Sequence, residues 1–107
     1  MWKIPIADID FNEREAEAVS GVIISKWLTM GDITADLEKR FAEFIGVKHA
    51  IAVSNCTSAL HLDNLALGIG KGDEVICPSL TFVAGANSIV YTGAKPVFVD
   101  CELDTFN

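Results

Sequence analysis

The sequence has few basic residues, and they are scattered along the chain. Its 107 residues contain eight Lys and Arg against fifteen Asp and Glu, a formal net charge of −7. Nucleic-acid binding proteins usually carry a basic face that follows the phosphate backbone. No run of Lys and Arg here is dense enough to form such a face. The composition therefore argues against nucleic acid as a partner.

The sequence also lacks an apolar segment suited to a membrane span. The longest uncharged stretch lies between Glu74 and Lys95 and is interrupted by Pro78, Asn87 and two glycines. This pattern predicts a strand, a turn and a helix rather than a transmembrane helix. No basic region followed by an apolar segment opens the chain, so we expect no signal peptide. We expect a cytoplasmic protein with no membrane partner.

Cysteine is scarce and shows no metal-binding or disulfide pattern. The chain has three cysteines, Cys56, Cys77 and Cys101, with no C-x-x-C pair. An odd number without paired spacing supports neither a disulfide framework nor a zinc site. We expect no metal site and a reducing compartment.

Two common phosphate-binding motifs are missing as well. Neither the Walker pattern G-x-x-x-x-G-K-[ST] nor the dinucleotide pattern G-x-G-x-x-G occurs. Residues 68–72 are rich in glycine, but they follow a predicted helix rather than a strand. They are interpreted as a turn.

The first helix is predicted from a capping pattern. Asn12 is a favourable N-cap, and Glu15 three residues later completes a capping box. The helix is predicted to run to about Ser25. Its apolar residues are expected to be buried, namely Val19, Val22 and Ile23.

A loop over residues 25–31 precedes a second predicted helix. This helix is expected to begin at Asp32 or Thr34 and to stop at Gly46, since glycine favours the position after a helix end. Its apolar residues fall at helical spacing, at Ile33, Leu37, Phe41 and Phe44.

After residue 46 the pattern alternates between strand and helix. Strands are predicted at 49–53, 74–77 and 96–99, and helices at 57–67 and 81–91. Short links between alternating elements imply parallel strands. The predicted class is α/β, as a three-layer α/β/α arrangement with an incomplete sheet. Because no closing element follows the last strand, we expect these residues to be part of a larger domain.

The polar run after the first predicted strand is the strongest candidate for a ligand site. Residues 53–59 place Ser, Asn, Thr and Ser where the chain turns into a helix. The free amides and the dipole at such a helix start favour an anion, and ligands bind at this end of parallel strands. A simple helix cap by Ser54 or Asn55 explains the same residues. Both interpretations stay open.

An aromatic residue follows the next strand. Phe82 lies one strand over from the candidate phosphate site, where its ring could stack on a flat heteroaromatic ligand. Ordinary core packing is the alternative, and local sequence alone favours it over stacking.

Four segments together resemble a known family. They are SKWLTMG at residues 25–31, GVKHAIAVSNCTSALHL at 46–62, GDEVICPSLTFVA at 72–84 and GAKPVFVD at 93–100. Their order and spacing resemble the DegT/DnrJ/EryC1/StrS aminotransferases over nearly the whole chain. The resemblance implies the large domain of the fold-type I PLP-dependent transferases, as in aspartate aminotransferase. Residues 1–45 would supply N-terminal helices and a substrate-side loop, and residues 46–107 the start of the cofactor-binding sheet.

The resemblance also implies site residues. The cofactor is expected to be pyridoxal 5'-phosphate (PLP), with Cys56, Thr57 and Ser58 at its phosphate and Phe82 stacked on its ring. The family's segment near the sugar nucleotide corresponds to Trp27, Thr29 and Gly31. Expected partners are a nucleotide-linked keto-sugar, an amino-acid donor such as glutamate, and a second subunit in a homodimer.

The resemblance assigns no catalytic residue to this chain. An aminotransferase needs a lysine that binds PLP covalently, and the family's lysine lies well beyond residue 107. None of the six lysines here matches that motif; they are Lys3, Lys26, Lys39, Lys48, Lys71 and Lys95. We therefore expect these residues alone to be inactive. Two alternatives stay open: a PMP-dependent sugar dehydratase of the same family, and a non-catalytic phosphate-binding or regulatory module.

Overall fold

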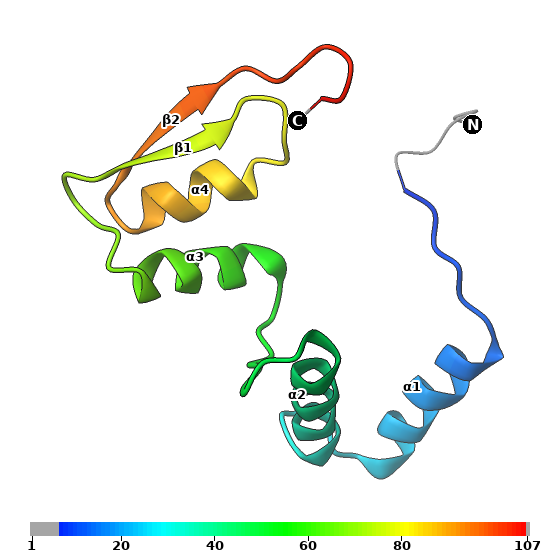
Figure 1. Ribbon diagram of the computed structural model, residues 1–107. Helices are drawn as coiled ribbons and strands as arrows, with labels where there is room; N and C mark the ends of the chain where they lie inside the picture. Colours follow the sequence, from blue (N-terminus) through cyan, green and yellow to red (C-terminus); the bar gives the residue numbers. More distant parts are fainter. Residues whose placement is uncertain (1–6, 107) are drawn as a thin grey trace. The chain divides into compact units, whose positions relative to one another are not determined.

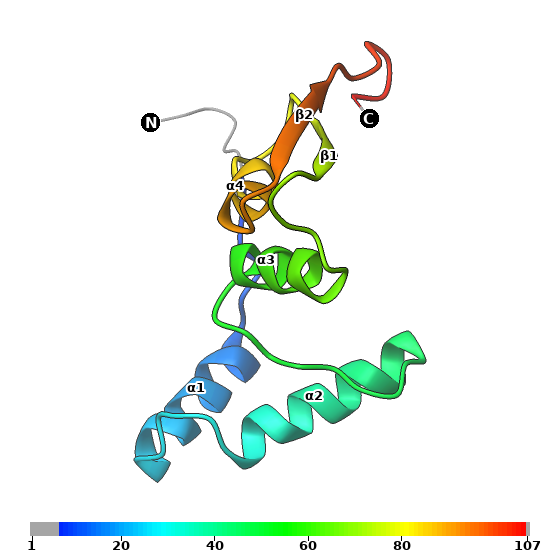
Figure 2. The same cartoon turned by 90° about the vertical axis from the view of Figure 1, so that its left-hand side faces the viewer.

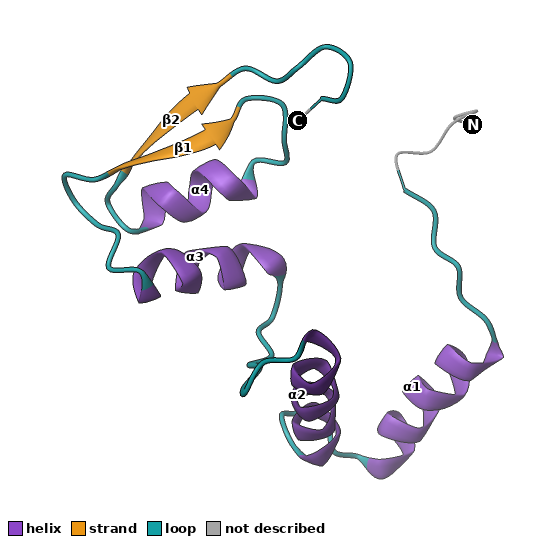
Figure 3. Cartoon of the chain, viewed as in Figure 1, coloured by secondary structure: helices purple, strands orange, loops and turns teal. Residues whose placement is uncertain are grey.

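The computed structural model describes residues 7–106. Residues 1–6 of the expected N-terminal segment (1–45) and residue 107 of the expected sheet segment (46–107) lie outside the described residues. Residues 7–106 form four helices and two strands, shown in Figure 1 and, by type of element, in Figure 3. The chain divides into two compact units, residues 1–51 and 52–107, and each is described by itself.

The first unit contains α1 (Glu13–Ser25), which begins as predicted. The Asn12 side chain accepts a hydrogen bond from the Arg14 amide at 2.9 Å, and the Glu15 carboxylate accepts one from the Asn12 amide at 2.8 Å. This is the expected capping box. The helix ends at Lys26, which adopts the left-handed conformation with φ of 60°.

The predicted burial of α1 is wrong for the described structure. None of its residues is buried; Val19 and Ile23 are about 60% exposed, and Val22 is half-buried. Helical spacing places apolar residues on one stripe of a helix, but burial requires a second element against that stripe. No described element packs there.

The second helix of this unit is α2 (Asp32–Ile45), and both predicted ends are confirmed. Gly46 follows it with φ of 79°, and its amide donates to the Ala42 carbonyl at 2.9 Å. The apolar stripe at helical spacing is present but more than half exposed along its length: Ile33, Leu37, Phe41 and Phe44. Only Ala42 of this helix is buried.

The second unit contains α3 (Cys56–Ala66), β1 (Glu74–Pro78), α4 (Ala84–Tyr91) and β2 (Lys95–Val99). The strands pair in parallel, with Glu74 opposite Lys95 and Pro78 opposite Val99. This confirms the predicted α/β class. The helix α4 connects the strands and packs against them, and α3 packs on α4, as the two views in Figures 1 and 2 show. Within this unit α4 thus supplies one of the two expected helix layers of the sheet.

The strand predicted at residues 49–53 does not form. The sheet has two strands in the described part of the chain, β1 and β2. A strand is stabilised by a ladder of hydrogen bonds to a neighbour, so an apolar extended segment outside the sheet does not become one. Residues 49–53 have a sequence suited to a strand, but no neighbouring strand pairs with them in the described structure.

The helix predicted from residue 81 begins three residues later, at Ala84. After β1, the Ser79 amide donates to the Val99 carbonyl at 2.9 Å, which keeps the chain along the sheet beyond the last paired residue. The chain therefore turns into α4 only after Val83. This delay leaves residues 79–83 as a loop at the carboxyl end of β1.

A small core holds the second unit together. Cys77 of β1, Ile89 of α4 and Ala94 before β2 are buried and contact one another, with Ile69, Val75 and Ala86 around them. Between the helices, the buried Ser88 hydroxyl donates to the Gly85 carbonyl at 2.8 Å and accepts from the Asn64 side chain at 3.2 Å. This hydrogen bond connects α3 to α4.

An ion pair joins the first residues of the two strands. The Lys95 ammonium donates to the Glu74 carboxylate at 2.6 Å. That hydrogen bond, and then the negative charge of the same carboxylate, raise the pKa of Lys95 above its ordinary 10.5. Both side chains are exposed, so the pair supports the parallel register rather than contributing much stability.

Replacing Ser88 by Ala tests the link between α3 and α4. We expect Ser88→Ala to lower the free energy of unfolding by about 1 kcal/mol, because the Asn64 amide loses its partner at a buried position. Ser20→Ala is the matched control, since the Ser20 hydroxyl bonds only to the Ala16 carbonyl on an exposed face of α1. Urea unfolding followed by circular dichroism measures both. Equal stability of the two variants would contradict the assigned role of Ser88.

Candidate functional site

Parallel pairing brings several chain ends together in the second unit. The carboxyl ends of β1 and β2 and the N-termini of α3 and α4 lie on the same side, on the right in Figure 1. In open α/β sheets this is the side where ligands bind. Two of the predicted site segments lie there: residues 54–58 at the start of α3, and Phe82 just before α4.

The start of α3 is capped by Asn55. Its side-chain oxygen accepts from the Ser58 amide at 2.9 Å and lies 3.2 Å from the Ser58 hydroxyl. The Ser54 hydroxyl accepts from the Asn55 side-chain nitrogen at 3.2 Å and lies 3.3 Å from the Ser58 hydroxyl. The capping interpretation is therefore confirmed, with Asn55 rather than Ser54 as the cap.

The cap leaves other donors at the same helix start. The amides of Cys56 and Thr57 are in the first turn, where helix geometry provides no acceptor. The Thr57 hydroxyl has no hydrogen-bond partner among residues 7–106. The first turn of α3 also contains no acidic residue, in contrast to those of α1 and α2. Two amides, one hydroxyl and the helix dipole thus suit a phosphate group, and the cap does not compete for them.

Phe82 is not a core residue in this structure. Its side chain is 77% exposed, in the loop between β1 and α4. Its carbonyl accepts a hydrogen bond from the Gly85 amide at 3.4 Å, in the first turn of α4. An exposed ring at the carboxyl end of the sheet remains available for stacking on a ligand.

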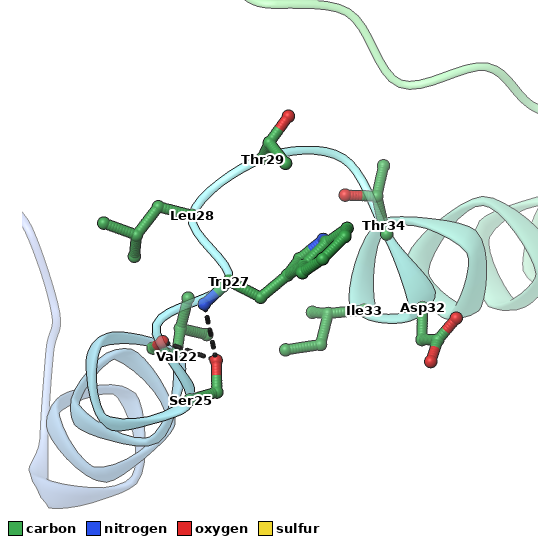
Figure 4. Close-up of a pocket in the computed structure, with 9 residues that line it drawn as sticks. Val22, Ser25, Trp27, Leu28, Thr29, Asp32, Ile33 and Thr34 are labelled. Atoms are coloured by element: carbon green, nitrogen blue, oxygen red, sulfur yellow. Dashed lines mark hydrogen bonds between the residues drawn. The ribbon is translucent and has the colours of Figure 1, made fainter.

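The first unit holds a hollow of about 590 Å³ between α1 and α2 (Figure 4). All three residues predicted near the substrate line it: Trp27, Thr29 and Gly31. Six others, which sequence reasoning did not assign, complete the lining: Val22, Ser25, Leu28, Asp32, Ile33 and Thr34. Ser25 and Leu28 lie within the predicted loop and the other four within three residues of it, and this proximity was the signal that could have identified them.

The Trp27 ring is held in place by the loop itself. Its indole nitrogen donates to the Met30 carbonyl at 3.2 Å, and its backbone amide donates to the Ser25 hydroxyl at 3.2 Å. That hydroxyl in turn donates to the Val22 carbonyl at 2.7 Å at the end of α1. The loop therefore presents the indole in one defined position.

Gly31 makes room for this ring. A β-carbon at Gly31 would lie 2.4 Å from the Trp27 indole nitrogen, well inside van der Waals contact. Its backbone is extended, with φ of −171°, a conformation open to any residue. Glycine is thus required by the position of Trp27 and not by the backbone.

The structure brings the predicted residues together in two groups. Cys56, Thr57, Ser58 and Phe82 belong to the second unit, and Trp27, Thr29 and Gly31 belong to the first. Among the described residues, no group of three His, Cys, Asp or Glu side chains is arranged to hold a metal ion. No helix in residues 7–106 has the length and apolar character needed to cross a bilayer.

The sequence is similar to those of sugar aminotransferases. GDP-perosamine synthase of Caulobacter vibrioides is 51% identical over 100 residues, which cover 92% of this chain and 26% of that protein. The UDP-4-amino-4-deoxy-L-arabinose–oxoglutarate aminotransferase of Shewanella sediminis is 44% identical over 101 residues, covering 94% of this chain and 26% of that protein. The chain therefore spans about a quarter of the length of these relatives.

Solved structures agree with the sequence relatives. A sugar aminotransferase assigned in Streptococcus pneumoniae, solved in its PLP form, matches 98% of this chain and 27% of its own with a TM-score of 0.84 and 36% identity. The sequence profile of the DegT/DnrJ/EryC1/StrS aminotransferase family matches residues 9–107. The α/β arrangement with a small parallel sheet agrees with the N-terminal part of the fold of these PLP-dependent sugar aminotransferases. The chain belongs to the DegT/DnrJ/EryC1/StrS aminotransferase family.

Proposed function

We propose that the protein carrying these residues is a PLP-dependent aminotransferase that transfers an amino group from an amino acid, with glutamate the expected donor, to a nucleotide-linked keto-sugar. The observation that carries this proposal is the family match over residues 9–107, which includes both groups of site residues. The relatives named above act on GDP- and UDP-linked sugars by their names. These residues would form the N-terminal part of the enzyme.

The start of α3 supplies the phosphate contacts in this proposal. The amides of Cys56 and Thr57 and the Thr57 hydroxyl would donate to phosphate oxygens of PLP, and the helix dipole would favour their negative charge. Ser58 completes the turn through its bonds to Asn55. Phe82 would stack on the pyridine ring and orient it. When bound, PLP supplies an electron sink for the amino-group transfer.

The remaining parts of the active site would come from elsewhere in the protein. A covalently attached lysine and an acidic partner for the ring nitrogen are required, and no residue described here is assigned to either role. The hollow around Trp27, Thr29 and Gly31 would take part of the sugar nucleotide. We further propose a homodimer that works in the cytoplasm.

A pair of variants at Thr57 tests the phosphate contact. In the full-length protein, Thr57→Val removes the hydroxyl at nearly constant volume, and we expect about tenfold weaker PLP binding because one hydrogen bond to a charged group is lost. Thr57→Ser keeps the hydroxyl and should bind within about twofold of the original. Titration followed by PLP absorbance measures both. Equal affinities of the two variants would overturn the assignment.

Variants with and without an aromatic ring at position 82 test whether Phe82 stacks on PLP. We expect Phe82→Leu to weaken PLP binding by about fivefold, because an aliphatic side chain cannot provide aromatic stacking. Phe82→Tyr keeps the ring and should retain the affinity. Since Phe82 is exposed, neither change should lower stability appreciably. A Leu variant that binds PLP like the original protein would remove Phe82 from the site.

Gly31→Ala tests the hollow of the first unit. The added methyl group would displace the Trp27 indole, so we expect KM for the sugar nucleotide to rise about tenfold with little change in kcat. Gly21→Ala is the matched control, because a β-carbon there meets no atom within 4 Å. Ala at this interior position of α1 should instead stabilise the helix by roughly 1 kcal/mol. An unchanged KM in Gly31→Ala would show that the position of Trp27 does not affect binding of the sugar nucleotide.

A further inference from the structure

The charges around the hollow are unusual for a phosphate site. Of its nine lining residues, Asp32 alone is charged, and neither Lys nor Arg is among them. Phosphate sites in proteins are built from basic side chains or from helix N-termini. The N-terminus of α2 does reach the hollow, but Asp32 in its first turn adds a carboxylate beside it, which points away from the Trp27 ring in Figure 4. That carboxylate would repel a phosphate group.

The Trp27 ring offers a fixed and open aromatic surface. Its nitrogen is occupied by the Met30 carbonyl and its position is set by Gly31, while 62% of the side chain is exposed. An aromatic face is electron-rich and attracts the weakly positive C–H groups on one face of a sugar ring. Val22 and Ile33 add aliphatic surface on the same hollow.

Thr34, which follows the loop in the first turn of α2, adds one hydroxyl to the lining of the hollow. It is half-buried, and its hydroxyl has no partner among the described residues. In Figure 4 its oxygen is turned toward the side of the loop that contains the Trp27 ring. A half-buried hydroxyl without a partner can bind a sugar hydroxyl at little cost in desolvation.

We infer that this hollow binds the sugar ring of the substrate, with the Trp27 face as its stacking surface and Thr34 as a specificity-determining hydrogen-bonding residue, and that the phosphates and nucleoside lie outside it. The inference deepens the proposed function and rests on it. Because Thr34 would contact only the sugar, a change at this residue should alter the affinity for the sugar nucleotide and leave the affinity for the free nucleotide unchanged.

Calorimetric titration of the PLP-loaded, full-length protein tests the inference. Two probe pairs are compared, GDP with GDP-mannose and UDP with UDP-glucose, and the pair that binds more tightly is kept. We expect Thr34→Val to weaken binding of the sugar nucleotide about fivefold while leaving the affinity for the free nucleotide unchanged. Thr34→Ser should restore the affinity for the sugar nucleotide.

Asp32→Asn provides the opposing test. If phosphates occupied the hollow, removing this carboxylate would strengthen binding of the free nucleotide, and Thr34→Val would affect both members of the pair equally. Either result overturns the inference and leaves the proposed function standing. Absence of PLP absorbance, or of binding by all four probes, would instead overturn the proposed function, and the inference with it.

Discussion

Parallel pairing of β1 with β2 is the constraint on which the second unit depends. Two parallel strands cannot be joined by a tight turn, so the chain must return through a crossover, and α4 is that crossover. Its contact with the sheet through Cys77, Ile89 and Ala94 creates the core. Because both strands then end on the same side, the starts of α3 and α4 lie there too. The candidate cofactor site follows from this pairing.

A steric constraint has the same importance in the first unit. A β-carbon at Gly31 would lie 2.4 Å from the Trp27 indole nitrogen, so any side chain at position 31 would displace the ring. The loop therefore folds around the ring. The Trp27 amide donates to the Ser25 hydroxyl at the start of the loop, and the indole nitrogen donates to the Met30 carbonyl near its end. One aromatic residue thus connects the end of α1, the loop and the start of α2.

The two sites differ in the kind of chemistry that they present. The start of α3 combines free amides with a helix dipole and no nearby acid, which suits an anion. The hollow of the first unit combines an aromatic face, aliphatic side chains and a hydroxyl, and its charge is negative. The phosphate of PLP suits the first site in the proposed function, and the sugar ring of the proposed substrate suits the second.

The local sequence determined the features that depend on neighbours in the chain. The capping box at Asn12, the end of α2 at Gly46, the two paired strands and the short links were predictable because each depends on residues a few positions apart. The motif order also identified the family, since four separate segments agreed. The cap at Asn55 was predictable from the residue types, and phosphate binding at Cys56–Ser58 stays a prediction, since the cap takes the Ser58 amide and leaves those of Cys56 and Thr57.

Tertiary structure decided what depends on contacts between distant segments. Residues 49–53 have a strand sequence but form no strand, because a strand exists only beside a partner. The stripes of α1 and α2 are apolar but uncovered, because periodicity says nothing about the element that would cover them. The close approach of Gly31 to Trp27 and the turn of Thr34 toward the loop were also invisible in the sequence. They follow from the path of the chain in space, which residue types alone do not encode.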